Sequence, residues 1–338
     1  MKATINDVAR LAGVSKKTVS RVINRSPLLS DATRERVQTV IDELGYVPNP
    51  QARALALGRN FLIGLIHDNP NSQMVLGVQQ GILDALHGTD FELVVRPVDR
   101  RSPAMLDDVR AFLERQRLFG VVLLPPISEN DALARLCEES GCRYTRMGSA
   151  MLDTPDRMVA SDDQDAVKAA TEYLIAQGHR RIGLVEGPQG FRSAKERRIG
   201  FEAALAEAGI DLPKGYMTQG DYTFASGLEA ARRLLDRSPR PTAIFASNDE
   251  MAAGVLHAAR QRGLSIPEDL SIVGFDDTAI AAHIWPPLST VRWPILQMAY
   301  SAAVKLIGDA GDDDGPGKQS RFPSALVRRA SVAPPPQE

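Results

Sequence analysis

Three cationic side chains near the start of the chain have the types and spacing needed to read DNA bases. Lys16, Lys17 and Arg21 follow directly after the turn-forming sequence Gly13-Val14-Ser15. A helix inserted in the major groove presents the side chains of its first turns to base edges, and cationic groups there suit the O6 and N7 acceptors of guanine. A solubilising basic face is the alternative interpretation of the same residues.

Three short helices are expected to position these cations. The first helix starts at Thr4, the second at Ser15 and the third at Ser30, because hydroxyl side chains favour the N-cap position. Gly13 and Gly45 end the first and third helices. Apolar residues recur at helical spacing on the inward face of each helix: Ile5, Val8, Ala9 and Ala12, then Val19, Val22 and Ile23, then Val37, Val40, Ile41 and Leu44. This pattern predicts a trihelical helix-turn-helix domain.

The charge distribution separates a basic head from an acidic body. Residues 1–60 contain ten Lys and Arg against five Asp and Glu, whereas the remaining residues contain thirty against thirty-seven. A basic head indicates a polyanionic partner, although a solvated face would give the same count. The 338 residues are 43% hydrophobic and 24% charged, which is typical of a soluble globular protein.

Beyond the head, the pattern changes to short apolar runs separated by amphipathic helices. The runs predicted to be strands are 61–66, 91–95, 121–124, 181–185, 243–246 and 270–274. Alternating strands and helices predict an α/β body of doubly wound parallel sheets in two similar subdomains, with a ligand cleft between them. We therefore expect four parts: head 1–47, linker with a conditional helix 48–60, body 61–332 and flexible tail 333–338.

Signatures of catalysis, metal binding and membrane insertion are missing. The sequence has no Rossmann, P-loop, nucleophile-elbow or zincin motif. The carboxylate pairs Asp162-Asp163 and Asp276-Asp277 are better explained as helix caps or ligand contacts than as acid–base catalysts, and Cys137 and Cys142 as packing residues. With neither an export-type segment nor a run of ~18 apolar residues, we expect a cytoplasmic protein that is not an enzyme and holds no cofactor or metal.

A series of motifs runs in order from the head to the end of the body. They are TINDVARLAGVS (4–15), TVSRVIN (18–24), LGYVPN (44–49), GHRRI (178–182), SNDEMA (247–252), GFDD (274–277) and PPLSTV (286–291). This series resembles the LacI/GalR family of bacterial transcriptional regulators over residues 3–331. The resemblance implies a body like that of periplasmic binding proteins, a homodimer and a near-palindromic operator of double-stranded DNA as partner.

The resemblance also assigns roles in DNA binding. The leucine that matches Leu55 enters the minor groove as a wedge, in a hinge helix that folds on the operator. Ala52, Ala54 and Ala56 permit the close approach of two such helices, although Leu55 could instead pack on the body. Contacts with the DNA backbone are expected from residues flanking the recognition helix: Thr4, Ser15, Thr18, Ser20, Asn24, Tyr46 and Asn49.

The effector site is carried over from the family position by position. Arg197 matches an arginine that grips ligand hydroxyls or a carboxylate, Asn248 a polar contact and Asp276 a carboxylate that accepts from sugar hydroxyls. An Arg197–Asp276 structural ion pair is the alternative. Further expected contacts, whose aromatic members could equally be core residues, are Asp68, Gln73, Phe191, Ser193, Tyr222 and Trp293.

Departures from the family pattern bear on the ligand. Polar residues from Asn71 to Gln73 replace a common aromatic pair, which disfavours a purine. Gly148 stands where an acidic residue is common, and Arg146 nearby would favour an anionic or differently shaped ligand. We expect a sugar or sugar derivative.

The sequence as a whole predicts a dimeric repressor of a carbohydrate-utilisation operon that a sugar-like effector releases from its operator. The C-terminal residues lack an additional leucine heptad, so a dimer is the simplest state. The alternatives are a corepressor-dependent regulator and a solute-binding protein of a sugar transport system. A solute-binding protein of a transport system would have no function for a basic DNA-binding head.

Overall fold

The computed structural model describes residues 3–23, 28–46, 60–308 and 319–337. The chain divides into two units, the first ending at Leu62 and the second beginning at Ile63. Most of the predicted linker lies outside the described residues, and so do three predicted DNA contacts, Asn24, Asn49 and Leu55.

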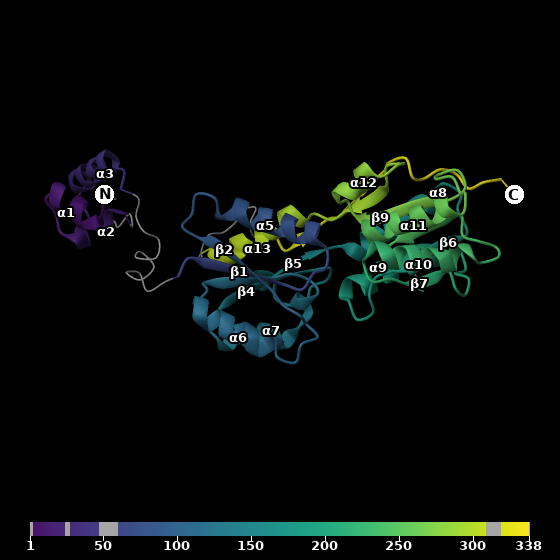
Figure 1. Cartoon of the computed structure of the whole chain (residues 1–338), viewed down its shortest axis with the longest axis horizontal. Helices are drawn as coiled ribbons and strands as arrows, with labels where there is room; N and C mark the ends of the chain where they lie inside the picture. Colours follow the sequence, from purple (N-terminus) through teal and green to yellow (C-terminus); the bar gives the residue numbers. More distant parts are fainter. Residues whose placement is uncertain (1–2, 24–27, 47–59, 309–318, 338) are drawn as a thin grey trace. The chain divides into compact units, whose positions relative to one another are not determined.

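The head consists of three helices around a small apolar core (Figure 1). They are α1 (Ile5–Leu11), α2 (Lys16–Ile23) and α3 (Asp31–Leu44). Gly13 and Gly45 have φ angles of 64° and 54°, so each supplies the left-handed residue that ends a helix. The buried core is formed by the predicted inward residues Val8, Ala9, Ala12, Val19, Val22, Val37 and Val40. The predicted trihelical head is confirmed.

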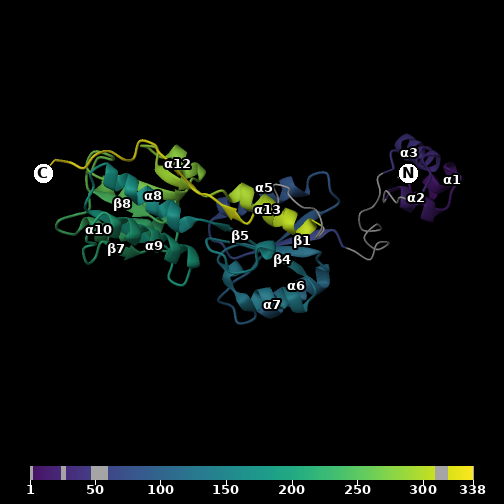
Figure 2. The same cartoon turned by 180° about the vertical axis from the view of Figure 1, so that it is seen from behind.

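The first half of the body is a sheet with strand order β11-β5-β4-β3-β1-β2. Its strands are β1 (Leu62–His67), β2 (Glu92–Pro97), β3 (Gly120–Leu123), β4 (Arg143–Gly148), β5 (Met158–Ser161) and β11 (Arg321–Phe322). Its helices are α5 (Ser72–Leu86), α6 (Met105–Gln116), α7 (Asp131–Glu139) and α13 (Ile295–Ile307), with the short turns η1 (Ile127–Glu129) and η2 (Pro155–Arg157). Helices α5 and α13 cover one face of the sheet, and α6 and α7 cover the other (Figures 1 and 2).

The second half repeats this architecture, with strand order β12-β10-β9-β8-β6-β7. Its strands are β6 (Ile182–Glu186), β7 (Met217–Gln219), β8 (Ala243–Ala246), β9 (Ser271–Asp276), β10 (Ser289–Arg292) and β12 (Ala325–Val327), of which β12 pairs antiparallel with β10. Its helices are α8 (Asp163–Ala176), α9 (Arg192–Glu207), α10 (Phe224–Leu235), α11 (Asp249–Gln261) and α12 (Ala279–His283). The predicted α/β body of two subdomains is confirmed.

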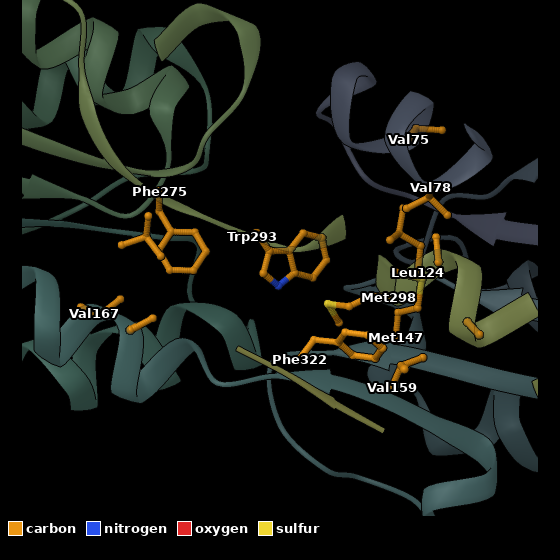
Figure 3. Packing of buried hydrophobic residues seen from close by; sticks show 14 of the residues in the cluster. Val75, Val78, Leu124, Met147, Val159, Val167, Phe275, Trp293, Met298 and Phe322 are labelled. Carbon is orange, nitrogen blue, oxygen red and sulfur yellow. The ribbon is translucent and has the colours of Figure 1, made fainter. Parts of the chain in front are cut away.

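The chain passes between the two sheets after β5, after β10 and after β11. Trp293 lies on the second of these crossings, with Phe275 on one side and Met298 and Phe322 on the other (Figure 3). Its indole Nε1 donates to the Ser161 hydroxyl at 2.7 Å, which joins the second crossing to the first. A packed and hydrogen-bonded hinge therefore connects the subdomains.

The backbone of Ala333, near the end of the chain, forms hydrogen bonds with the body. The Ala333 carbonyl lies 2.9 Å from His179 Nε2 and accepts from the Ser271 hydroxyl at 3.0 Å, and the Ala333 N–H donates to that hydroxyl oxygen at 3.1 Å. The prediction of a flexible tail beginning at 333 is therefore wrong for Ala333, because backbone groups satisfied in this way fix its position. In the part of the chain that the structure describes, no helix has the length and apolar character of a membrane span.

Candidate functional site

The predicted base-reading residues lie on the outward side of α2. Val19 and Val22 are buried, which turns Lys16 and Lys17 outward as exposed side chains and leaves Arg21 half-buried. Helix α2 thus presents cationic side chains from its first turns and anchors the opposite side in the head core. This is the arrangement that insertion into a major groove requires.

Hydroxyl groups organise the starts of the first two helices. The Thr18 N–H donates to Ser15 Oγ at 3.1 Å, and the two hydroxyls lie 2.9 Å apart. The Thr4 N–H and hydroxyl both donate to the Asp7 carboxylate, at 3.1 and 2.7 Å. Thr4 and Ser15 are exposed, Thr18 and Ser20 are half-buried, and Tyr46 packs against the head core. Contact of these residues with the DNA backbone stays a prediction.

The body contains a pocket where loops from both subdomains meet. The space between its lining atoms is about 530 Å³, which includes space open to solvent. The first subdomain contributes Asn69, Pro70, Asn71, Met74, Pro125, Pro126 and Ser149. The second contributes Asp163, Phe191, Ser193, Arg197, Tyr222, Asn248 and Asp276, and the crossing contributes Trp293. These loops follow the carboxyl ends of strands, where open α/β sheets bind ligands.

Arg197 lies at the centre of the polar side of the pocket. Its Nε donates to Asp163 Oδ2 at 2.9 Å, its Nη1 donates to the Ser247 carbonyl, and its Nη2 lies 3.7 Å from Asp276 Oδ1. Burial alone disfavours the charged guanidinium, but the neighbouring carboxylates keep the pKa of Arg197 above its usual value. The arginine is thus a fixed, charged donor.

Asp276 is a buried carboxyl in an unusual backbone conformation. Its φ angle is 106° and that of Asp277 is 56°, both in the region that side chains rarely adopt. Asp249 anchors the loop by accepting from the N–H and hydroxyl of Thr278, at 2.7 and 3.1 Å. Burial raises the pKa of Asp276 well above its ordinary value, and only Arg197 lowers it. In the described part of the chain, the Asp276 carboxyl oxygens accept no hydrogen bond, so they are available to a ligand that donates.

An aromatic and hydroxyl cluster forms another side of the pocket. The Ser193 and Tyr222 hydroxyls lie 2.9 Å apart, and the rings of Phe191 and Tyr222 meet edge to face at 5.8 Å. Both ends of the Asn248 amide are used, since Oδ1 accepts from the Met251 N–H and Nδ2 donates to the Tyr222 carbonyl. Asn248 therefore shapes the pocket mainly as the N-cap of α11.

Two predicted ligand contacts, Asp68 and Gln73, do not line the pocket. The Asp68 carboxylate accepts from the backbone N–H of Arg100 at 3.3 Å and from the Arg100 guanidinium at 3.5 Å. That guanidinium lies over the Phe191 ring. Gln73 is exposed on the first turn of α5, and the pocket is lined instead by the next residue, Met74, because one position turns a helical side chain by about 100°.

The expectation that Arg146 favours an anionic or differently shaped ligand is wrong in so far as it requires Arg146 to contact the ligand. Its buried guanidinium donates to the Ser128 carbonyl at 2.6 Å and to Asp131 at 2.9 Å, and it does not line the pocket. The residue after Gly148, Ser149, does line the pocket. Its buried hydroxyl has no hydrogen-bond partner among the described residues.

Sequence reasoning missed most of the first subdomain's contribution to the pocket. The Asn69-Pro70-Asn71 loop had a usable signal, because asparagine and proline after a strand mark a loop before a helix cap. Asp163 belonged to a recognised carboxylate pair, but its partner Arg197 lies on another element. Pro125 and Pro126 gave no comparable signal.

The remaining carboxylates and both cysteines have structural surroundings. Asp162 accepts from the Ser324 N–H at 2.7 Å, and Asp277 pairs with Arg292 and Arg329 at 2.7 and 2.6 Å. Cys137 and Cys142 are buried, and burial raises the pKa of Cys142 to about 12, so its thiol is unreactive. Among the described residues, no three His, Cys, Asp or Glu side chains are grouped to hold a metal.

Comparison with known proteins finds a family match in each of the two units. Residues 4–49 match the family model of bacterial regulatory proteins of the lacI family, and residues 171–332 match that of a periplasmic binding protein-like domain. The HTH-type transcriptional regulator CelR of Thermobifida fusca is 37% identical over 314 residues, which cover 90% of this chain and 91% of that protein. The ribose operon repressor of Escherichia coli (strain K12) is 34% identical over 296 residues, covering 86% and 88%.

Solved structures give the same result. The lac repressor dimer bound to operator and the anti-inducer ONPF has a TM-score of 0.80 at 28% identity, covering 98% of this chain and all of that one. The complex of the transcriptional regulator CelR with cellobiose has a TM-score of 0.71 at 33% identity, covering 97% and 99%. The chain therefore belongs to the lacI family of bacterial regulatory proteins and is a DNA-binding transcriptional regulator.

Proposed function

We propose that the protein is a repressor of a carbohydrate-utilisation operon and that a sugar-type ligand in the body pocket releases it from its operator. The observation that carries this proposal is the Asp276 carboxyl, which lines the pocket, is 9% exposed and accepts no hydrogen bond from the described residues. A buried acceptor of this kind needs a donor. Ligand hydroxyls supply donors, and the rings of Tyr222 and Trp293 offer apolar surfaces to a sugar.

The pocket can control DNA binding because it is built from both subdomains. A ligand that contacts Asn71 and Ser149 on one side and Arg197 and Asp276 on the other favours one arrangement of the two subdomains over others. If that arrangement separates the two linkers (48–60) of a dimer, the ligand weakens operator binding. The lac repressor bound to operator and the sugar complex of CelR support this assignment by similarity.

A homodimer is part of the proposal. Four apolar side chains on the packed helices α5 and α13 are exposed: Leu76 by 66%, Leu83 by 46%, Leu296 by 49% and Tyr300 by 38%. A second copy of the chain would cover these side chains and bring two heads to the two halves of a near-palindromic operator. The structure of the lac repressor as a dimer on its operator supports this partner.

We assign no catalytic role and place the regulator in the cytoplasm, where its DNA partner is. Asp162, Asp163 and Asp277 are held by the Ser324 N–H, by Arg197 and by Arg292 and Arg329, so neither acidic pair offers the two free carboxyl groups that acid–base work requires. A solute-binding protein would use the same pocket but has no need of the head.

A thermal-shift screen of neutral mono- and disaccharides tests the proposed ligand class. Ligands that bind the folded chain raise its melting temperature by mass action. At least one sugar should raise the melting temperature of the wild-type chain and fail to do so for Asp276→Ala, whereas Asp156→Ala at an exposed position should behave as wild type. A panel without any shift would refute the sugar-type effector.

A further inference from the structure

The polar side of the pocket has an imbalance of charge. One guanidinium, that of Arg197, faces two carboxyl groups, those of Asp163 and Asp276. The side chains are exposed by 6%, 0% and 5%, so water screens these charges little. With all three groups ionised, the lining of the pocket carries one excess negative charge.

Two of the three nitrogen atoms of the Arg197 guanidinium have a hydrogen-bond partner. Nε is bonded to Asp163 and Nη1 to the Ser247 carbonyl, whereas Nη2 lies 3.7 Å from Asp276 Oδ1 in the pocket lining. A guanidinium recognises a carboxylate or phosphate best through two parallel N–H donors. Asp163 at Nε removes the fork that Nε and a terminal nitrogen of Arg197 would otherwise offer to a ligand.

Other cations near the pocket are also paired. Arg100, over the ring of Phe191, is bonded to Asp68, and Arg192 is bonded to Glu196 at 2.7 Å. Neither arginine lines the pocket, where Arg197 is the one cationic residue in the described part of the chain. An anionic ligand would therefore meet no unpaired cation.

We propose that the pocket selects an uncharged or cationic polyhydroxyl ligand and rejects anionic ones such as sugar phosphates and uronates, with Asp163 as the residue that sets this selectivity. The inference rests on the proposed function, because it narrows the sugar-type ligand by charge. Asp163 acts by occupying Arg197 and by adding its own negative charge beside Asp276.

Matched ligand sets test the selectivity. Glucose, galactose and mannose are each compared with their uronate, 6-phosphate and 2-amino forms by isothermal titration calorimetry on the wild-type chain and on Asp163→Asn. For each sugar that binds, the two anionic forms should bind at least tenfold more weakly than the neutral form. Asp163→Asn should reduce this discrimination at least threefold, because an amide keeps the volume and removes the charge. A uronate or phosphate that binds the wild-type chain more tightly than its parent sugar would overturn the proposal.

Asp162→Asn is the matched control. It removes the neighbouring carboxylate, which accepts from the Ser324 N–H and does not line the pocket. The control should keep the discrimination of the wild-type chain. An equal loss in both variants would mean that general charge, and not Asp163 in the pocket, sets the selectivity, and would also overturn the proposal.

A second measurement needs no ligand. The charged or titratable groups that act on Asp276 are Arg197 of α9, Asp163 of α8, Asp249 and Glu250 of α11, and Tyr222. Burial and the three acidic neighbours raise the pKa of Asp276 above its value in the unfolded chain, so the folded chain binds the extra proton and loses stability as the pH rises. Asp276→Asn should therefore melt at a higher temperature than the wild-type chain at pH 8, with a smaller difference at pH 5.

The two measurements separate the two claims. If Asp276→Asn melts at a lower temperature than the wild-type chain at pH 8, Asp276 is a stabilising partner of Arg197. That result would overturn the claim that the pocket lining carries excess negative charge. If Asp276→Asn melts higher at pH 8 and neither the matched sets nor the thermal-shift screen yields a sugar that binds, the excess charge is supported and the sugar-type effector of the proposed function is refuted.

Discussion

The Arg197 Nε lies 2.9 Å from the Asp163 Oδ2, and the two side chains are exposed by only 6% and 0%. This ion pair joins α9 to the first residue of α8, directly after the crossing between the two sheets. The Ser161 hydroxyl donates to the other oxygen of Asp163 at 2.5 Å and accepts from the Trp293 indole. The arginine that lines the pocket is thus bonded to the crossings that connect the two subdomains.

Arg197→Ala should abolish the response to ligand and also lower stability. Removing the arginine leaves Asp163 buried without its partner, which costs about 3–5 kcal/mol in unfolding free energy. Arg198→Ala is the matched control. Arg198 is 46% exposed and pairs at the surface with Glu202 and Glu186. Such exposed ion pairs contribute only about 0–1 kcal/mol to the free energy of unfolding. Urea unfolding of both variants measures the difference, and equal free energies would contradict the role of the buried pair.

Arg21→Ala should weaken operator binding by about 1–3 kcal/mol and relax the preference at one symmetric base position. Arg36→Ala removes the same charge from an exposed position of α3 and should weaken binding to all sequences alike. Selection of binding sites from a randomised duplex library, followed by sequencing, reports both profiles. An unchanged profile for Arg21→Ala would show that this residue does not read bases.

Leu55→Ala should reduce operator bending and operator affinity together, because the family resemblance predicts that Leu55 is the apolar wedge that opens the central base step. The body pocket is built from other residues, so the affinity for a ligand that binds the wild-type chain should stay the same. A circular-permutation gel assay measures the bend, and full bending by the variant would refute the wedge.

Leu76→Arg should convert the dimer into a monomer, because a buried cation without a partner disfavours the association of two apolar faces. Glu114→Arg places the same side chain at an exposed position of α6, on the other face of the sheet, and should leave the dimer intact. Sedimentation velocity distinguishes the two states. A dimer of unchanged strength in Leu76→Arg would place the interface elsewhere.

Patterns confined to neighbouring residues predicted the fold well. The three head helices follow from caps, glycines and apolar spacing, and each of the six apolar runs became a strand of the body. The other six strands were not among the predicted runs: β4, β5, β7, β10, β11 and β12. Of these, β7, β11 and β12 have only two or three residues, and β4, β5 and β10 mix polar with apolar side chains. Their pairing depends on neighbours far away in the chain.

The candidate site could be predicted only in part, since its geometry depends on where distant elements meet. Arg197, Asp276, Phe191 and Ser193 line one pocket, and their contact with a ligand, which the family resemblance implies, stays a prediction. The choice of Met74 over Gln73 depends on the rotation of α5, which a motif cannot give. The pairing of Arg197 with Asp163 depends on the packing of α8 against α9, and it decides the charge of the pocket.

Operator affinity measured with and without ligand tests the central claim most directly. A fluorescein-labelled duplex carrying the selected operator is titrated with the wild-type chain, alone and with a saturating amount of a sugar that raises the melting temperature. The sugar should weaken operator binding at least tenfold, and saturating operator should weaken sugar binding by the same factor. Equal operator affinity in the two titrations, with binding of the sugar verified in the second, would contradict a repressor controlled through this pocket.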